Sequence, residues 1–308
     1  MNRWWIYQRE RFPFQAHGPL IAAFSLSAVC YSALLRGPGA RPLALGALVA
    51  FATSFCSFAQ LRIADEFKDA DEDRRYRPYR PVPRGLVTLR ELAWIGAGGA
   101  GLQLALCLWL ATRGGALRWQ LAALLLVTWT YFTLMSREFF APEWLKARPV
   151  VYLFSHMFIM PLVDWYATGC DWVPAGGPMP SGLFWFLAAS FCNGLVIELG
   201  RKIRAPEQEE EGVRTYTALW GRPVAVASWL AAVVATLACG LGAARRIGFL
   251  AVFAPAMGAL LAGAVVLGVV FVRTARGGLA RGIEAYSGAW TLALYLLLGV
   301  VPWAARAG

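Results

Sequence analysis

The chain has 308 residues, of which 58% are hydrophobic and 15% charged, a composition that excludes an ordinary soluble domain and predicts several membrane-spanning helices. Its formal charge of +11 invites a nucleic-acid interpretation, which we reject because the charged residues lie between apolar runs. The six cysteines form no CxxC pair and the two histidines are far apart in the sequence, so neither a disulfide framework nor a histidine metal site is expected.

Nine apolar segments are long enough to cross a bilayer as helices. They cover residues 19–35, 43–61, 92–112, 117–136, 149–168, 182–199, 223–243, 248–272 and 287–304. Several are rich in Gly and Ala, which lets membrane helices pack closely. We therefore expect an all-α fold, a single transmembrane domain over residues 1–308 with nine helices around a central cavity.

Basic residues are divided unevenly between the two sides that alternate along these segments. The side of the N-terminus collects most of the 29 Lys and Arg residues, so the positive-inside rule predicts a cytoplasmic N-terminus. The Ala-, Gly- and Arg-rich composition is typical of a GC-rich bacterium, which favours an inner (plasma) membrane location. On the opposite side only Asp164 and Asp171 are acidic, and we expect both in an interfacial loop.

The first polar cassette, residues 62–90, begins where the second apolar segment ends. Asp65, Asp69 and Asp73 follow one another at four-residue spacing, so on a continuous helix their carboxylates share one face. Three carboxylates so close repel one another, and Mg²⁺ removes that penalty because it prefers hard oxygen ligands and bridges to phosphate. Two basic residues of the cassette are expected to bind an anionic substrate: Arg62 and Arg80.

The second polar cassette, residues 198–222, leaves the sixth apolar segment on the same predicted side. Glu198 stands at the membrane end of the helix, Pro206 is expected to end that helix, and Gly212 permits a turn. Three bases follow Glu198 within two turns: Arg201, Lys202 and Arg204. The two cassettes are expected to face each other across a cavity. The acidic residues from Glu209 to Glu211 are interpreted as a solvated loop rather than as metal ligands.

The first cassette resembles the leading motif of the UbiA superfamily of intramembrane prenyltransferases. The resemblance rests on an ordered set at the end of the second of nine segments: Asp65, Asp69, Asp73, Arg74, Arg80-Pro81 and Gly85. In the second cassette, Gly212 to Thr215 and Gly221 fit the downstream part of the family's second motif. The two aspartates that usually precede that part are absent, and Glu198 with its neighbouring bases occupies their place.

The resemblance implies Mg²⁺-dependent transfer of a prenyl group from a prenyl diphosphate to a lipophilic or aromatic acceptor within the membrane, at a site that faces the cytoplasm. It implies that Asp65, Asp69 and Asp73 hold Mg²⁺. Either Glu198 is a further metal ligand and catalytic residue, or Arg201, Lys202 and Arg204 bind the diphosphate directly. Glu198 could equally be paired with the bases beside it. The resemblance also assigns diphosphate contacts in the loop between the fourth and fifth segments: Arg137 and Lys146.

Two residues inside apolar segments stay open to a structural interpretation. Asn193 either lines the site or packs between helices, and His156 is expected to be a satisfied packing residue. Two further functions remain as alternatives to a transferase. One is a UbiA-type terpene cyclase, which ionises a prenyl diphosphate without an acceptor, and the other is a non-catalytic protein that binds or transports lipid.

Overall fold

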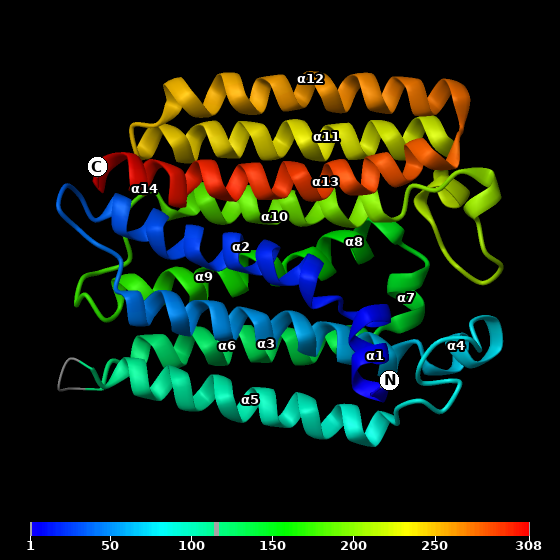
Figure 1. The fold of residues 1–308 in the computed structure, drawn as a ribbon, viewed down its shortest axis with the longest axis horizontal. Coiled ribbons are helices and arrows are strands. Elements are labelled where there is room, and N and C mark those ends of the chain that lie inside the picture. The colour runs from blue at the N-terminus through cyan, green and yellow to red at the C-terminus, as the bar shows by residue number, and fades with distance from the viewer. Residues whose placement is uncertain (1, 114–116, 308) are drawn as a thin grey trace.

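A computed structural model of the chain describes residues 2–113 and 117–307 as a bundle of helices (Figure 1). Within these residues there is no strand, and nine helical spans are long and apolar enough to cross a membrane, as the sequence predicts. The domain expected over residues 1–308 is therefore described except at residues 1, 114–116 and 308.

The nine spans follow one another along the chain, and two of them are made of two helices each. They are α2 (Phe14–Leu35), α3 (Ala44–Lys68), α5 (Leu89–Ala111), α6 (Trp119–Ser136), α8 (Pro149–Met157) with α9 (Ile159–Trp172), α10 (Leu183–Arg201), α11 (Tyr216–Arg246), α12 (Leu250–Thr274), and α13 (Gly277–Leu298) with α14 (Val300–Ala307). Short elements connect them: α1 (Arg3–Arg11), α4 (Ala70–Tyr76), α7 (Pro142–Lys146), and the 3₁₀ turns η1 (Glu138–Phe140) and η2 (Pro206–Gln208).

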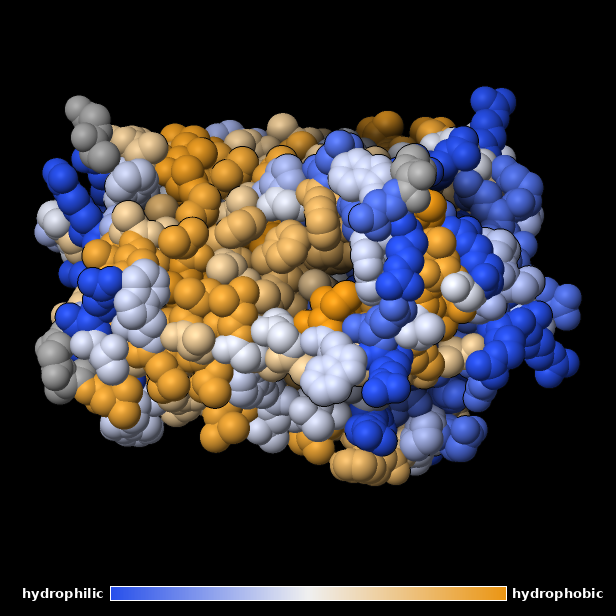
Figure 2. All heavy atoms as spheres, turned by 60° about the horizontal axis from the view of Figure 1, so that its bottom comes forward, coloured by the Kyte–Doolittle hydropathy of each residue, from blue (hydrophilic) through white to orange (hydrophobic). Residues whose placement is uncertain are grey.

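The two ends of the bundle differ in what they carry. The N-terminus, α1, α4 and α7 lie at one end, and the C-terminus lies at the other (Figure 1). Figure 2 shows a broad apolar band between the ends, with the denser hydrophilic cover on the end that carries α4. We name this the cassette end, because both polar cassettes, residues 62–90 and 198–222, emerge there.

Small residues let the helices pack closely enough to bury a continuous apolar core. A Cβ at Gly46 of α3 would collide with the carbonyl of Cys170 in α9, so these two backbones touch. Gly299, between α13 and α14, is similarly close to the backbone of Ser27 in α2. The central helices α2, α9 and α10 are the most buried of the bundle, and the other helices surround them.

The fifth span is broken, which its apolar pattern does not reveal. Helix α8 ends at Met157, and α9 begins at Ile159, two residues before Pro161. Pro161 has no backbone N–H to donate to the carbonyl of Met157, so one bond of a continuous helix is missing at this point. His156 lies in the last turn of α8, just before the break, and belongs to the wall of a cavity.

The expectation that Asp164 and Asp171 lie in an outer interfacial loop is wrong. Both are buried within α9, which continues to Trp172. Asp164 accepts a 2.8 Å hydrogen bond from the Tyr295 hydroxyl of α13, and Asp171 forms a two-point ion pair with Arg36 at the end of α2. Polar partners on other helices allow these carboxylates to be buried, and such partners cannot be read from a hydropathy scan.

Candidate functional site

A cavity of about 490 Å³ at the cassette end gathers residues from both cassettes. Its walls come from α3, α8, α10, the loop before α11, and the connection between α6 and α8. This volume lies within the range of small-molecule sites, about 300–1,000 Å³. The prediction that the two cassettes face one another across a cavity is therefore matched by the arrangement of the described residues.

Basic side chains outnumber acidic ones in the wall of this cavity. The acidic members are Asp65, Asp69, Glu72, Glu138 and Glu198. The basic members are Arg62, Lys68, Arg77, Arg80, Lys146, Arg201, Lys202, Arg204 and Arg214. A concave site with a surplus of one charge concentrates its field and attracts a ligand of the opposite charge. The cavity is therefore suited to an anion that also accepts many hydrogen bonds.

The aspartates of the first cassette do not all reach this cavity. Helix α3 ends at Lys68, and α4 begins at Ala70, although the backbone N–H groups of Asp69 and Asp73 still bond four residues back. Asp65 and Asp69 line the cavity, as predicted. Asp73 does not belong to the cavity wall, so the expectation of three carboxylates on one ligand-binding face holds for two of them.

Asp73 is instead the centre of a buried ion-pair cluster. Its carboxylate is 1% exposed and lies 2.9 Å from the Arg77 Nε. The Arg80 Nη1 donates to both of its oxygens, at 2.9 and 2.7 Å. Two guanidinium groups therefore neutralise the third aspartate from within its own cassette.

Asp65 and Asp69 retain the character of cation ligands. The side chain of Asp65 is 42% exposed, and its ion pair with Arg62 is long, at 3.5 Å. Among the described residues, Asp69 has no ion-pair partner. Burial raises the pKa of the Asp69 carboxyl above its ordinary value; the neighbouring ammonium of Lys68 opposes this, and the charges of Asp65 and Asp73 add to it. A bound cation would relieve this penalty.

The donor set fits one Mg²⁺ rather than a complete protein cage. Within residues 2–113 and 117–307, no group of three His, Cys, Asp or Glu side chains is close enough to hold a metal ion. Two carboxylates, Asp65 and Asp69, can supply part of an octahedral shell. Mg²⁺ in protein sites commonly takes its other ligands from water and from substrate phosphate, which matches a site with few protein donors.

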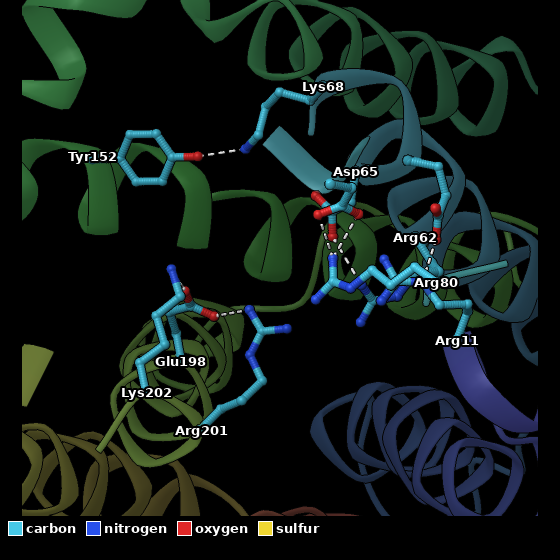
Figure 3. Close-up of polar contacts among 11 residues, drawn as sticks. Arg11, Arg62, Asp65, Lys68, Arg80, Tyr152, Glu198, Arg201 and Lys202 are labelled. Atoms are coloured by element: carbon cyan, nitrogen blue, oxygen red, sulfur yellow. Dashed lines mark hydrogen bonds and ion pairs between the residues drawn. The ribbon is translucent and has the colours of Figure 1, made fainter. Parts of the chain in front are cut away.

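Glu198 does not fit the interpretation as a metal ligand. Its carboxylate is 8% exposed, and both oxygens are occupied: Oε2 by Arg201 Nη2 at 2.5 Å and Oε1 by Lys202 Nζ at 2.8 Å. Figure 3 shows these three side chains together, opposite the group that contains Asp65 and Arg80. Glu198 therefore aligns two cations at the cavity, and the remaining N–H groups of Arg201 and Lys202 are free to bind an anion.

The other predicted substrate contacts divide into two groups. Arg62, Lys146 and Arg204 line the cavity, although Arg204 also pairs with Glu284 at 2.9 Å. Arg137 does not line it, because it is the exposed residue that ends α6. Asn193 does not line it either. It is fully buried in α10, and its side-chain oxygen accepts a hydrogen bond from Thr291 of α13, which supports the packing interpretation.

The acidic run after α10 holds the loop in place and does not face the cavity. The Glu209 carboxylate accepts 2.7 Å hydrogen bonds from the hydroxyls of Thr215 and Thr217, at the start of α11. Glu210 accepts a hydrogen bond from the Tyr79 hydroxyl of the first cassette. Gly212 has φ +76°, and a Cβ there would stand 2.6 Å from the ring of Tyr76. These contacts join the two cassettes at the rim of the cavity.

Several residues of the cavity wall were not among the predicted site residues, and three of them form one group: Lys68, Tyr152 and His156. The Lys68 Nζ donates to the Tyr152 hydroxyl at 2.5 Å (Figure 3). The same Nζ lies 3.8 Å from Glu138 Oε1. The Tyr152 ring stacks on His156 with centroids 3.8 Å apart. The signal available in the sequence was the four-residue spacing of a tyrosine and a histidine directly after a basic loop, which places both on one helix face.

Glu138 reaches this group through an unusual turn. Glu138, Phe139 and Phe140 all have positive φ, at 48°, 52° and 57°, in the left-handed region. Such a conformation costs a non-glycine residue about 1–2 kcal/mol. The turn directs the buried carboxylate of Glu138 toward Lys68 and the ring of Phe139 against Tyr131. Strain of this kind is concentrated at functional sites.

Comparisons with known proteins agree with this arrangement of helices and cassettes. The family model of UbiA prenyltransferases matches residues 25–282. The apo structure of a UbiA homologue from Aeropyrum pernix K1 superposes with a TM-score of 0.64 and 17% identity, over 91% of this chain and 95% of that chain. Digeranylgeranylglyceryl phosphate synthase superposes with a TM-score of 0.61 and 14% identity, over 98% and 99%. At these identities the two structures support the fold. Among curated proteins, none matches the sequence significantly.

Proposed function

Because the chain belongs to the UbiA prenyltransferase family, we propose that it transfers a prenyl group from a prenyl diphosphate to a lipophilic or aromatic acceptor within the membrane. One observation carries the proposal. The same cavity presents two carboxylates, Asp65 with only a 3.5 Å ion pair to Arg62 and Asp69 with no ion-pair partner among the described residues, and on another wall two cations aligned by Glu198. A diphosphate with a bound Mg²⁺ satisfies both walls at once, because its oxygens bind the metal and the cations together.

The basic residues would bind the diphosphate and stabilise it as a leaving group. When the allylic C–O bond breaks, negative charge grows on the diphosphate oxygens, and fixed donors such as Arg201, Lys202 and Arg62 favour that state over the ground state. Mg²⁺ held by Asp65 and Asp69 would supply further charge neutralisation at the same oxygens. Glu198 limits the freedom of its two cations, so less ordering is needed when the substrate binds.

The apolar part of the cavity would protect the allylic cation. Its wall includes Met135, Leu145, Met157, Ile159 and Met160. These side chains exclude water, which would otherwise capture the cation as an alcohol. A prenyl chain is itself apolar, so the same surface that excludes water can bind the donor.

The protein is an integral membrane protein by its nine apolar spans and its family. We place the cassette end on the cytoplasmic side of a bacterial plasma membrane, because most Lys and Arg residues outside the spans lie on that side. Fusion of a reporter enzyme that is active only outside the cytoplasm tests the orientation. Activity of a fusion in the loop of residues 77–85 would contradict it.

The experiment that tests the function uses purified protein in lipid nanodiscs with Mg²⁺ and a panel of prenyl diphosphates. Diphosphate release and prenylated product are measured with and without aromatic and lipid acceptors. Release that needs an acceptor is the expected result. Release with a cyclic hydrocarbon and no acceptor would replace the transferase with a terpene cyclase. Absence of release with every donor and acceptor would favour a lipid-binding or transport protein.

A further inference from the structure

Among the described residues, His156 is the one histidine in the wall of the cavity, and one of its ring nitrogens has no hydrogen-bond partner. The side chain is 9% exposed and sits on the last turn of α8. Its Nε2 is buried and has no hydrogen-bond partner among the described residues. A buried polar atom without a partner is unfavourable, so such atoms in native proteins call for a functional explanation. The expectation of a satisfied packing histidine is therefore wrong for this nitrogen.

The surroundings of the other ring nitrogen fix the tautomer. The Nδ1 lies 2.9 Å from the backbone carbonyl oxygen of Tyr152, and a carbonyl oxygen can only accept. The Ser155 hydroxyl donates to the same carbonyl, so its oxygen, 3.3 Å from Nδ1, is also available as an acceptor. The proton of a neutral imidazole must therefore reside on Nδ1. The Nε2 is left with an unshared electron pair at the cavity wall.

The ring is also held in position. It stacks on Tyr152 at an interplanar angle of 13° and meets the edge of Phe139 at 82°. Lys68 donates to the hydroxyl of that same Tyr152, which fixes the tyrosine ring that the imidazole stacks on. The wall residues that follow His156 in the chain are Met157 and Ile159, both apolar.

We propose that the Nε2 of His156 accepts the proton that the acceptor substrate loses when it is prenylated. This inference rests on the proposed function, and it defines the acceptor by its chemistry as a hydroxyl compound or an electron-rich aromatic ring. The allylic C–O bond breaks, and the diphosphate leaves with the electron pair. The acceptor oxygen or ring carbon bonds to the allylic carbon, and its proton moves to Nε2 to give an imidazolium, which afterwards returns the proton to water or to the released diphosphate.

The tautomer can be measured directly, because the chain has only two histidines. Protein labelled with ¹⁵N-histidine gives two imidazole spin systems, and the variant His17→Gln removes the other one. His17 is a suitable control because it is not part of the cavity wall. We expect an unprotonated, pyridine-type Nε2 and a protonated Nδ1 for His156. A proton on Nε2 in the resting protein would overturn the proposal, whether or not the protein is an enzyme.

Product partition then separates proton transfer from binding. His156→Phe keeps a ring against Tyr152 and removes the nitrogen, and His156→Gln keeps an acceptor atom that cannot take a proton. Both variants should still bind a non-hydrolysable prenyl thiolodiphosphate and release diphosphate with prenyl alcohol as the product. Prenylated acceptor should fall by about 100-fold or more, the usual contribution of a general base. In the variant His156→Gly, added imidazole should restore part of the lost formation of prenylated acceptor.

The outcomes are distinguishable. Diphosphate release by the native protein without any prenylated acceptor would refute the transferase, and this inference would fall with it. Prenylated product from His156→Phe at the native rate would refute the inference alone. Equal loss of diphosphate release and product in both variants, with native melting temperature and thiolodiphosphate binding, would also refute it, because proton acceptance follows C–O cleavage.

Discussion

Asp69 and Asp73 belong to the same four-residue series, yet the structure predicts opposite consequences when each is changed to asparagine. Asp73→Asn removes one charge from a cluster in which Arg77 and Arg80 lie 2.7–2.9 Å from the carboxylate. Breaking a buried ion pair by removing one partner costs about 3–5 kcal/mol. The Arg80 side chain is 20% exposed, so water offsets part of that cost and we expect about 3 kcal/mol.

That loss corresponds to a fall in melting temperature of about 6–12 °C, at about 2–4 °C per kcal/mol. The assay is thermal unfolding of the purified variants in one detergent, with Mg²⁺ chelated. Asp69→Asn should leave the melting temperature unchanged or raised, because it removes a half-buried charge with no ion-pair partner among the described residues. It should abolish Mg²⁺-dependent diphosphate release. An Asp73→Asn variant with native melting temperature and lost Mg²⁺ dependence would refute the assignment of Asp73 to a structural cluster.

Three further changes test other parts of the structure. Glu198→Gln should retain the Mg²⁺ dependence of diphosphate release, and loss of that dependence would show that Glu198 is a metal ligand. Lys202→Met should weaken binding of a prenyl thiolodiphosphate by about tenfold, the equivalent of one charge-assisted hydrogen bond. Phe140→Gly should raise the melting temperature because φ is 57° there, and Phe140→Ala should not, so equal melting temperatures would contradict the strain. The raised pKa of Asp69 means that the metal-free protein loses stability as pH rises from about 4 through that pKa, and saturating Mg²⁺ should weaken this trend in thermal unfolding.

The features that could be predicted from the sequence depend on local patterns. The nine spans follow from the length and hydropathy of each segment, and the first cassette follows from the spacing of its aspartates. The pairing of Glu198 with Arg201 and Lys202 was also within reach, because residues three and four apart on a helix are neighbours.

The remaining features depend on contacts between distant segments. Arg77 stands four residues after Asp73, but only the fold of the loop brings Arg80 back to the same carboxylate, which lies outside the cavity wall although both arginines belong to it. Whether the Nε2 of His156 has a partner depends on the side chains that other helices bring to the end of α8, and none of them reaches it among the described residues. A sequence pattern predicts which residues share one helix face, and it does not predict which residues of other helices contact that face.

The contacts between Tyr79 and Glu210 and between Tyr76 and Gly212 have a consequence for the speed of turnover. Since they join the first cassette to the second, movement of one side of the rim is coupled to movement of the other. Under the proposed function, the rate at which the two loops separate would set an upper limit on turnover, independent of the bond-breaking step. A side chain larger than hydrogen at position 212 would push the loops apart and alter substrate capture and product release together, although it touches no reacting atom.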